Sequence, residues 1–154
     1  MIKTLIPVRS HIVSGVLLSR QDGEIKILLM KRVKGNFWCH IAGKVETAET
    51  AVQAIVREIK EETQVQVSEL YSADYLEQFY EADQNVIEMI PVFLVYCTEH
   101  QQIVLNDEHS EYAWFSLQEA IEKAEFGGQR LLYQYIWDNF VHRKPSELLK
   151  IQLF

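Results

Sequence analysis

The spacing of apolar residues changes once in the first half of the chain, and this change constrains the fold more than any other feature. Residues 11–18 and 25–32 are rich in Val, Ile and Leu and flank the polar turn SRQDGE, which is typical of a β-hairpin. In residues 50–63 the apolar positions recur at helical spacing instead, at Ala51, Ala54, Ile55 and Ile59. This period predicts an amphipathic helix after the hairpin.

The rest of the chain continues with strand patterns and then helical ones. Residues 63–80, 85–99 and 111–117 carry β-branched and aromatic residues, and Pro91 in the second of these stretches is tolerated only at a sheet edge or a bulge. Ser116 is placed to cap a helix over residues 117–124. A second amphipathic helix is expected over residues 129–142, with an apolar face of Leu131, Leu132, Tyr135, Ile136 and Phe140.

This order of elements, without internal repeats or a visible linker, predicts one domain over residues 1–154, a mixed α/β (α+β) sandwich with helices on both faces of the sheet. The 48% hydrophobic content is sufficient for a sizeable core. The C-terminal stretch KPSELLKIQLF packs either on the body or on a partner chain.

The net charge of -7 disfavours broad adhesion to nucleic acid or to an anionic membrane. No run approaches the ~20 apolar residues that cross a bilayer, and the N-terminus lacks an apolar leader pattern, so we expect a cytoplasmic protein. Cys39 and Cys97 have no metal-ligand spacing and are expected to be reduced thiols. A polyanionic substrate then requires a local cation.

Carboxylates crowd the predicted helix and the turn before it. Glu58, Glu61 and Glu62 fall within one helical turn, where like charges repel. Mg²⁺ takes oxygen ligands and would relieve that repulsion. Arg57 is one turn from Glu61 and is able to orient a neighbouring carboxylate. Gly43 permits a tight loop whose carbonyl approaches a metal.

The spacing of these residues resembles the Nudix box, G-x5-E-x7-R-E-U-x-E-E-x-G-U, in which U is a bulky aliphatic residue. The resemblance runs from Gly43 through Glu49, Arg57 and the glutamates to Val65, and one fixed position differs, because Gln64 stands in place of a glycine. That glycine normally takes the left-handed conformation that ends the helix, so Gln64 is expected to cost about 1 kcal/mol. An isolated acidic helix is more often a solvated face, but chance agreement at this many spacings is very improbable.

The resemblance implies a Nudix-type α/β/α sandwich with the box as a loop-helix-loop, and a hydrolase that uses Mg²⁺, with Mn²⁺ as a substitute. It implies metal binding by Glu58, Glu62 and the Gly43 carbonyl, and a share for Glu61 in coordination or in activating water. It assigns Arg57 and Glu49 the task of orienting the carboxylates. Glu49 is expected to begin the helix.

The stretch LNDEHSEYAWFSL is similar to the branch of the family that hydrolyses dATP and dihydroneopterin triphosphate. Glu108 is the candidate for a fourth carboxylate and general base, although a solvated acidic turn explains it equally well. Lys31 and Arg32 either bind phosphates or face solvent. His40 and His109 lie near the expected site, and a lone histidine is a weak signal. Trp114 is expected in the core.

Three functions remain open at this point. The first is Mg²⁺-dependent cleavage of a nucleoside triphosphate (dATP-like) or dihydroneopterin triphosphate to a monophosphate and pyrophosphate. The second is a Nudix hydrolase of a dinucleoside polyphosphate, a nucleotide sugar or ADP-ribose. The third is a non-catalytic nucleotide sensor, which is disfavoured because such domains usually lose the box glutamates. The implied partner is a small nucleotide or pterin triphosphate, and a homodimer is left open.

Overall fold

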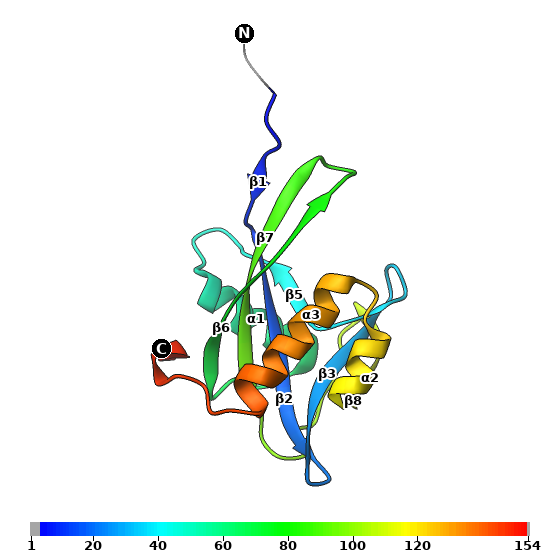
Figure 1. Ribbon diagram of the computed structural model, residues 1–154, viewed down its shortest axis with the longest axis vertical. Coiled ribbons are helices and arrows are strands. Elements are labelled where there is room, and N and C mark those ends of the chain that lie inside the picture. Colours follow the sequence, from blue (N-terminus) through cyan, green and yellow to red (C-terminus); the bar gives the residue numbers. More distant parts are fainter. Residues whose placement is uncertain (1–3, 154) are drawn as a thin grey trace.

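The computed structural model describes residues 4–153 and has one mixed β-sheet between helical layers (Figure 1). The helices are α1 (Ala51–Thr63), α2 (Leu117–Lys123) and α3 (Gly127–Ile136), and α3 continues into a π-helical turn at Trp137–Val141. The strands are β1 (Val8–Arg9), β2 (Ile12–Gln21), β3 (Glu24–Arg32), β4 (Trp38–Cys39), β5 (Ile41–Lys44), β6 (Leu70–Glu81), β7 (Val86–Tyr96), β8 (His109–Phe115) and β9 (Lys150–Ile151).

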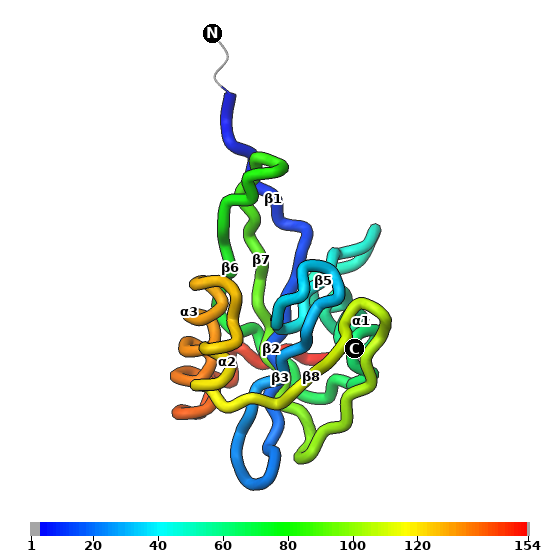
Figure 2. Tube along the Cα trace, turned by 90° about the vertical axis from the view of Figure 1, so that its right-hand side faces the viewer, coloured from blue at the N-terminus to red at the C-terminus, as the bar shows by residue number. Residues whose placement is uncertain are grey.

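The sheet order is β4-β3-β2-β7-β6-β9, and β1, β5 and β8 pair with β7, β2 and β3 respectively. The pairs β2–β7 and β1–β7 are parallel, and the others are antiparallel. Figure 2 shows α1 on one side of the sheet and α2 and α3 on the other. The expected mixed sandwich with helices on both faces is confirmed.

Alternation along the central strand builds one core on each face of the sheet. In β2, Val13 and Leu17 pack with Ile55 and Ile59 of α1. The intervening positions Val16 and Leu18 pack with residues of α2 and α3. Period-two alternation in a strand that is buried on both faces therefore positions both helical layers.

The predicted hairpin of β2 and β3 is confirmed, and its two strands separate beyond the turn. Asp22 and Gly23 both have positive φ, 53° and 84°, as a two-residue hairpin turn of this kind requires. β2 pairs with β3 only over residues 18–21 and 24–27, and further along it pairs with β5. β3 pairs instead with β4 at Met30 and Lys31. Residues 38–44 therefore enter the gap between the two strands and reach α1.

Helix α1 ends at the turn that its sequence predicts, but it begins later than expected. Thr50 is the N-cap, and Thr50 and Gln53 exchange hydrogen bonds in a capping box. Glu49 lies before that cap, so the expectation that Glu49 begins the helix is wrong. At the other end Gln64 takes the left-handed conformation, with φ of 62°, and its N–H donates to the Lys60 carbonyl. The residue that replaces the box glycine thus keeps the glycine conformation.

Two expectations about the apolar faces need correction. Helix α3 buries Leu132, Tyr133 and Ile136, whereas Leu131 is 68% exposed. Leu132, Ile136 and Phe140 are buried as predicted, and Tyr133 is buried where Leu131 was expected. Trp114 is only partly buried and packs against the edge of the α1-side core rather than inside it.

Pro91 lies in β7, which is paired on both sides, and its position is explained by a bulge. The register of β6 against β7 shifts between Ser72 and Leu76, and Leu76 is the residue opposite Pro91. On its other side β7 pairs with β1 at Ile87 and Glu88 and with β2 only from Val92 onward. The missing N–H of Pro91 therefore falls where no ladder bond is needed.

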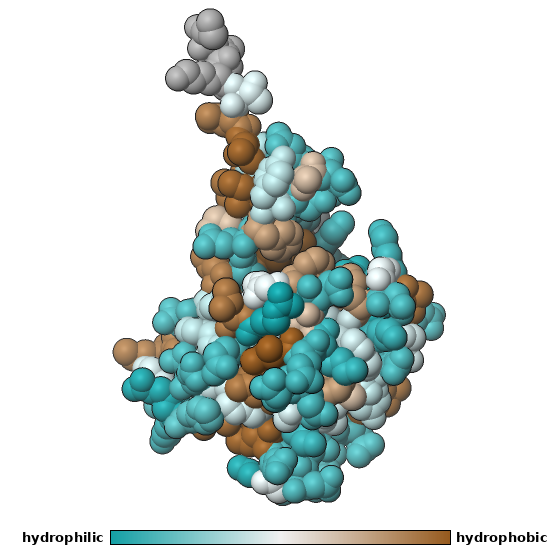
Figure 3. All heavy atoms as spheres, turned by 45° about the vertical axis from the view of Figure 1, so that its right-hand side comes forward, coloured by the Kyte–Doolittle hydropathy of each residue, from teal (hydrophilic) through white to brown (hydrophobic). Residues whose placement is uncertain are grey.

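The C-terminal stretch packs on the body, because β9 pairs with Leu70 and Tyr71 of β6. The far ends of β6 and β7 extend past the helices together with β1 (Figure 1). The surface of the segment that leads into β1 is largely hydrophobic (Figure 3). Leu5, Ile6 and Val8 there are 78%, 53% and 61% exposed. A homodimer stays a prediction. None of the helices in residues 4–153 is long and apolar enough to pass through a membrane.

Candidate active site

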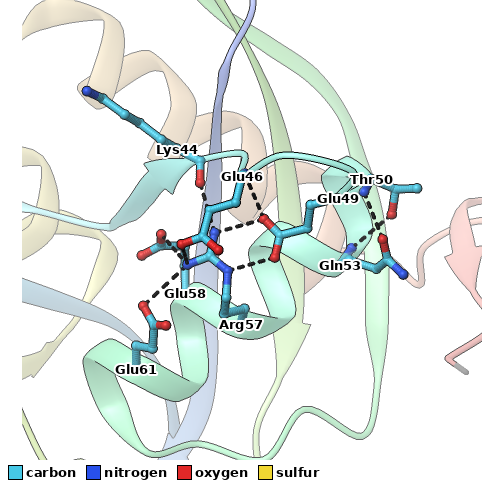
Figure 4. A network of polar contacts seen from close by, with 8 residues as sticks. All are labelled: Lys44, Glu46, Glu49, Thr50, Gln53, Arg57, Glu58 and Glu61. Atoms are coloured by element: carbon cyan, nitrogen blue, oxygen red, sulfur yellow. Dashed lines mark hydrogen bonds and ion pairs between the residues drawn. The ribbon is translucent and has the colours of Figure 1, made fainter.

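Arg57 is the centre of the polar network at the start of α1 (Figure 4). Its Nε and Nη2 atoms donate to the two carboxylate oxygens of Glu49 at 2.7 and 2.9 Å, a bidentate pair. Nη2 also donates to the Lys44 carbonyl at 2.9 Å. Nη1 donates to Glu58 at 2.8 Å and to Glu61 at 3.3 Å. One guanidinium therefore ties the loop before the helix to the carboxylates on it.

Glu49 completes this connection from the loop side. Its Oε1 atom accepts a hydrogen bond from the Glu46 backbone N–H at 2.9 Å. The hydrogen bonds from Arg57 lower the pKa of Glu49 to about 2, and the Glu46 N–H contributes to this shift. Glu49 is therefore ionised at neutral pH and forms an ion pair with the guanidinium, and its role in orienting the other carboxylates stays a prediction.

Gly43 lies directly against Glu58, and the close approach explains why this position carries no side chain. A Cβ atom at Gly43 would overlap the carboxyl group of Glu58. The ladder between β5 and β2 places Gly43 opposite Val13, on the face that α1 covers. The absence of a side chain thus lets a helix carboxylate lie against the strand backbone.

Glu62 is the buried carboxylate of the group. It is 2% exposed, and its Oε2 atom has no hydrogen-bond partner among residues 4–153. Burial raises the pKa of Glu62 to about 9, and the charges of Glu58, Glu108 and Glu61 add to that shift. Burial also raises the pKa of Glu58, against the opposing effect of Arg57. A buried carboxyl group beside other carboxylates and without a donor is the environment that a cation would satisfy.

The other candidates surround this pair of glutamates. Glu108 is exposed in the loop before β8, and its charge contributes to the raised pKa values of both Glu58 and Glu62. The charge of Arg32 lowers the pKa of Glu62 and so opposes these effects. The guanidinium carbon of Arg32 lies 5.2 Å from the centroid of the Phe37 ring. Lys31 is one residue earlier, 3.8 Å from Glu111. The structure thus brings Glu108 and Arg32 to the box, and it pairs Lys31 with a neighbouring strand.

Within residues 4–153 no three His, Cys, Asp or Glu side chains form a ready-made metal-binding group. The arrangement accounts for this, since Glu58 is held by Arg57 and Glu61 is 54% exposed. The buried, unpartnered oxygen of Glu62 and the contact of Glu58 with Gly43 nevertheless fit a divalent cation. The metal-binding roles of Gly43, Glu58, Glu61 and Glu62 stay a prediction.

A second polar network, on the opposite face of the sheet, was not predicted from the sequence. Ser14 donates to Oε2 of Glu77 at 2.6 Å, and His40 Nε2 lies 3.0 Å from the same oxygen. His40 Nδ1 lies 2.8 Å from the Tyr133 hydroxyl. These residues come from β2, β6, α3 and the junction of β4 and β5. An acidic residue in an alternating strand reads as solvent-facing, so the only signal was the isolated His40.

Comparison with known proteins matches the NUDIX domain model to residues 9–135, and the chain therefore belongs to the NUDIX family. It is 29% identical to an octanoyltransferase of Myxococcus xanthus over 122 residues, 77% of this chain but 34% of that protein. It is 24% identical to a dihydroneopterin triphosphate diphosphatase of Haemophilus influenzae over 123 residues, 70% and 75% of the two chains. An Ap4A hydrolase binary complex from C. elegans superposes with a TM-score of 0.74 at 22% identity, over 85% of this chain and 96% of that one. The expected family and fold are confirmed.

Proposed function

We propose that this protein is a divalent-metal-dependent pyrophosphohydrolase that adds water to a nucleoside or pterin triphosphate and releases a monophosphate and pyrophosphate. The observation that carries the proposal is the buried, unpartnered Glu62 beside Glu58 and Gly43, within a complete set of box carboxylates. The similarity to the dihydroneopterin triphosphate diphosphatase of Haemophilus influenzae supports the triphosphate class.

In this proposal Glu58, Glu62 and the Gly43 carbonyl hold the metal, and Glu61 shares in its binding. The bound metal would neutralise phosphate charge and lower the pKa of a water molecule. Arg57 and Glu49 keep the carboxylates in place through the bidentate pair. Glu108 accepts the proton of the attacking water, since it is exposed and its charge raises the pKa values of both Glu58 and Glu62. Arg32, with Lys31 beside it, binds the phosphates.

The retained glutamates make a silent sensor less favourable, because crowded carboxylates raise the pKa of Glu62 and destabilise its charged form, and a bound cation would stabilise that form. A dinucleoside polyphosphate is the second candidate substrate, since the chain is also 27% identical over 128 residues to an asymmetrical bis(5'-nucleosyl)-tetraphosphatase of Mus musculus. Both candidates use the same carboxylates, so they differ in product rather than in site.

The test is product release from a panel of nucleoside triphosphates, dihydroneopterin triphosphate, ADP-ribose and diadenosine tetraphosphate, each with Mg²⁺ and with EDTA. The proposal predicts Mg²⁺-dependent release of pyrophosphate from triphosphates, and loss of this activity in Glu62→Gln. Mononucleotide release from diadenosine tetraphosphate alone would move the assignment to the second candidate. No turnover of any compound by a folded protein would refute hydrolysis and favour the sensor.

A further inference from the structure

The Glu77 network is a built site that presents one carboxylate oxygen to the surface. Ser14 and Tyr133 are fully buried and His40 is 4% exposed, while the Glu77 side chain keeps 14% of its surface exposed. Oε2 of Glu77 is engaged by Ser14 and His40. Oε1 has no hydrogen-bond partner among residues 4–153 and is not among the enclosed polar atoms that lack one. The buried groups thus fix a carboxylate whose second oxygen is available.

The hydrogen bonds of the network define the chemical character of that oxygen. With Tyr133 donating to Nδ1 of His40, the His40 Nε2–H donates to Glu77, and every buried polar atom of the four residues has a partner. Burial raises the pKa of Glu77, but His40 and the Ser14 hydroxyl outweigh burial and keep the pKa below its usual value. Glu77 is therefore an ionised, acceptor-only group held in one orientation.

The Glu77 network and the box lie close together along β5, on opposite faces of the sheet. Ala42 pairs with Ser14 in the ladder between β5 and β2, so both side chains lie on one face, and Ala42 is exposed. Ala42 immediately precedes Gly43, and the three residue-to-residue steps from His40 to Gly43 span roughly 10 Å in an extended chain. Burial raises the pKa of the Cys39 thiol, and the charges of Glu62 and Glu77 add to that shift. His40, which orients Glu77, and Gly43, which lies against Glu58, are therefore near neighbours on the same stretch of chain.

Apolar surface for a flat ring lies beside the carboxylate. Phe79 is two residues beyond Glu77 in β6, so it is on the same face of the strand, and it is 50% exposed. An aromatic side chain of this kind is able to stack on a heterocycle while the neighbouring carboxylate accepts hydrogen bonds from N–H groups at the edge of that ring.

We propose that Glu77 is a specificity-determining residue that accepts hydrogen bonds from adjacent N–H and NH₂ groups of a 2-amino-4-oxopyrimidine edge, the edge shared by guanine and pterin rings. This inference rests on the proposed function for the position of the phosphates, but not for the recognition itself. Adenine places a ring-nitrogen lone pair beside its amino group, and that lone pair faces the carboxylate unfavourably. A site built around donors rejects a ring that lacks them.

The recognition is tested by equilibrium binding in EDTA, followed by protein fluorescence, so that hydrolysis is not required. GMP and neopterin are compared with AMP and with IMP, which differs from GMP only by the missing 2-amino group. The wild type is expected to bind GMP and neopterin roughly 10- to 100-fold more tightly than AMP, as for hydrogen bonds to a charged acceptor. IMP, with one of the two donors, is expected between them.

The variant Glu77→Gln keeps the shape of the side chain and replaces part of the acceptor by a donor. It is expected to lose the preference for GMP and neopterin while its affinity for AMP changes less than twofold. Glu122→Gln, the same change at an exposed site on α2, serves as the control and should bind as the wild type does. Tighter binding of neopterin than of GMP would identify the pterin ring as the preferred ligand of Glu77. Tighter binding of GMP would identify guanine.

Two outcomes separate this inference from the proposed function. Selective binding that depends on Glu77, without turnover of any triphosphate, would support the recognition and refute the hydrolase. Turnover of triphosphates with equal affinity for GMP, IMP and AMP in the wild type, or with unchanged selectivity in folded Glu77→Gln, would refute the recognition and leave the hydrolase standing.

Discussion

Replacing Glu62 by Gln should make the metal-free protein more stable at neutral pH. Glu62 is buried, and its pKa rises from 4.5 to about 9. Between these values the folded chain keeps a proton that the unfolded chain has lost, so stability falls as the pH rises. Each pH unit in this window costs about 1.4 kcal/mol. pH 7 lies about 2.5 units above the lower of the two pKa values, so the free energy of unfolding is lowered by at most roughly 3 kcal/mol.

The neutral amide of Glu62→Gln escapes this cost, because it has no proton to lose. Urea unfolding in EDTA should show the variant less than about 1 kcal/mol more stable than the wild type at pH 5 and roughly 2–3 kcal/mol more stable at pH 7. Addition of Mg²⁺ should stabilise the wild type and not the variant. Glu61→Gln, at a side chain that is 54% exposed, is the matched control and should follow the pH dependence of the wild type. Parallel curves for the wild type and Glu62→Gln would refute the buried-proton argument.

Three further substitutions address the box. Gly43→Ala places a Cβ on the Glu58 carboxyl group, so kcat should fall at least 100-fold while the circular dichroism spectrum is retained; unaffected turnover would contradict the close approach. Arg57→Lys loses the bidentate pair with Glu49, so kcat should fall at least tenfold with a smaller change in KM, and equal kcat values would count against positioning. Gln64→Gly relieves the left-handed conformation and should raise the free energy of unfolding by about 1 kcal/mol, and a loss in urea denaturation would contradict this.

The sequence predicted best those features that depend on local spacing. The hairpin, the body of helix α1 and its end at Gln64 follow from period and turn chemistry, which act within a few residues, whereas the predicted start at Glu49 lies before the Thr50 cap. The Arg57 network was also within reach, because the spacing of the box fixes which side chains share a helix face. Leu131 was wrongly placed on the buried face, and Tyr133 was missed, because residues 131–133 are consecutive apolar residues and the helical period alone does not show which two of them are buried.

The features that the sequence did not predict depend on contacts between distant segments. Ser14 and Glu77 are 63 positions apart, and His40 and Tyr133 are 93 apart. Their meeting follows from the pairing of β5 with β2 and from the packing of α3 on the sheet, neither of which has a local signature. The burial of Glu62, in contrast to the exposure of Glu61, likewise depends on how α1 rotates against Gly43 and β2.

The most direct test of the central claim is a titration with Mn²⁺ followed by electron paramagnetic resonance of the free ion, with wild type, Glu62→Gln and Glu122→Gln. If Glu62 and Glu58 hold the cation, the wild type and Glu122→Gln bind Mn²⁺ with the same Kd, and Glu62→Gln binds at least tenfold more weakly. Equal Mn²⁺ affinity in wild type and folded Glu62→Gln would contradict the assignment of the metal to this cluster of carboxylates.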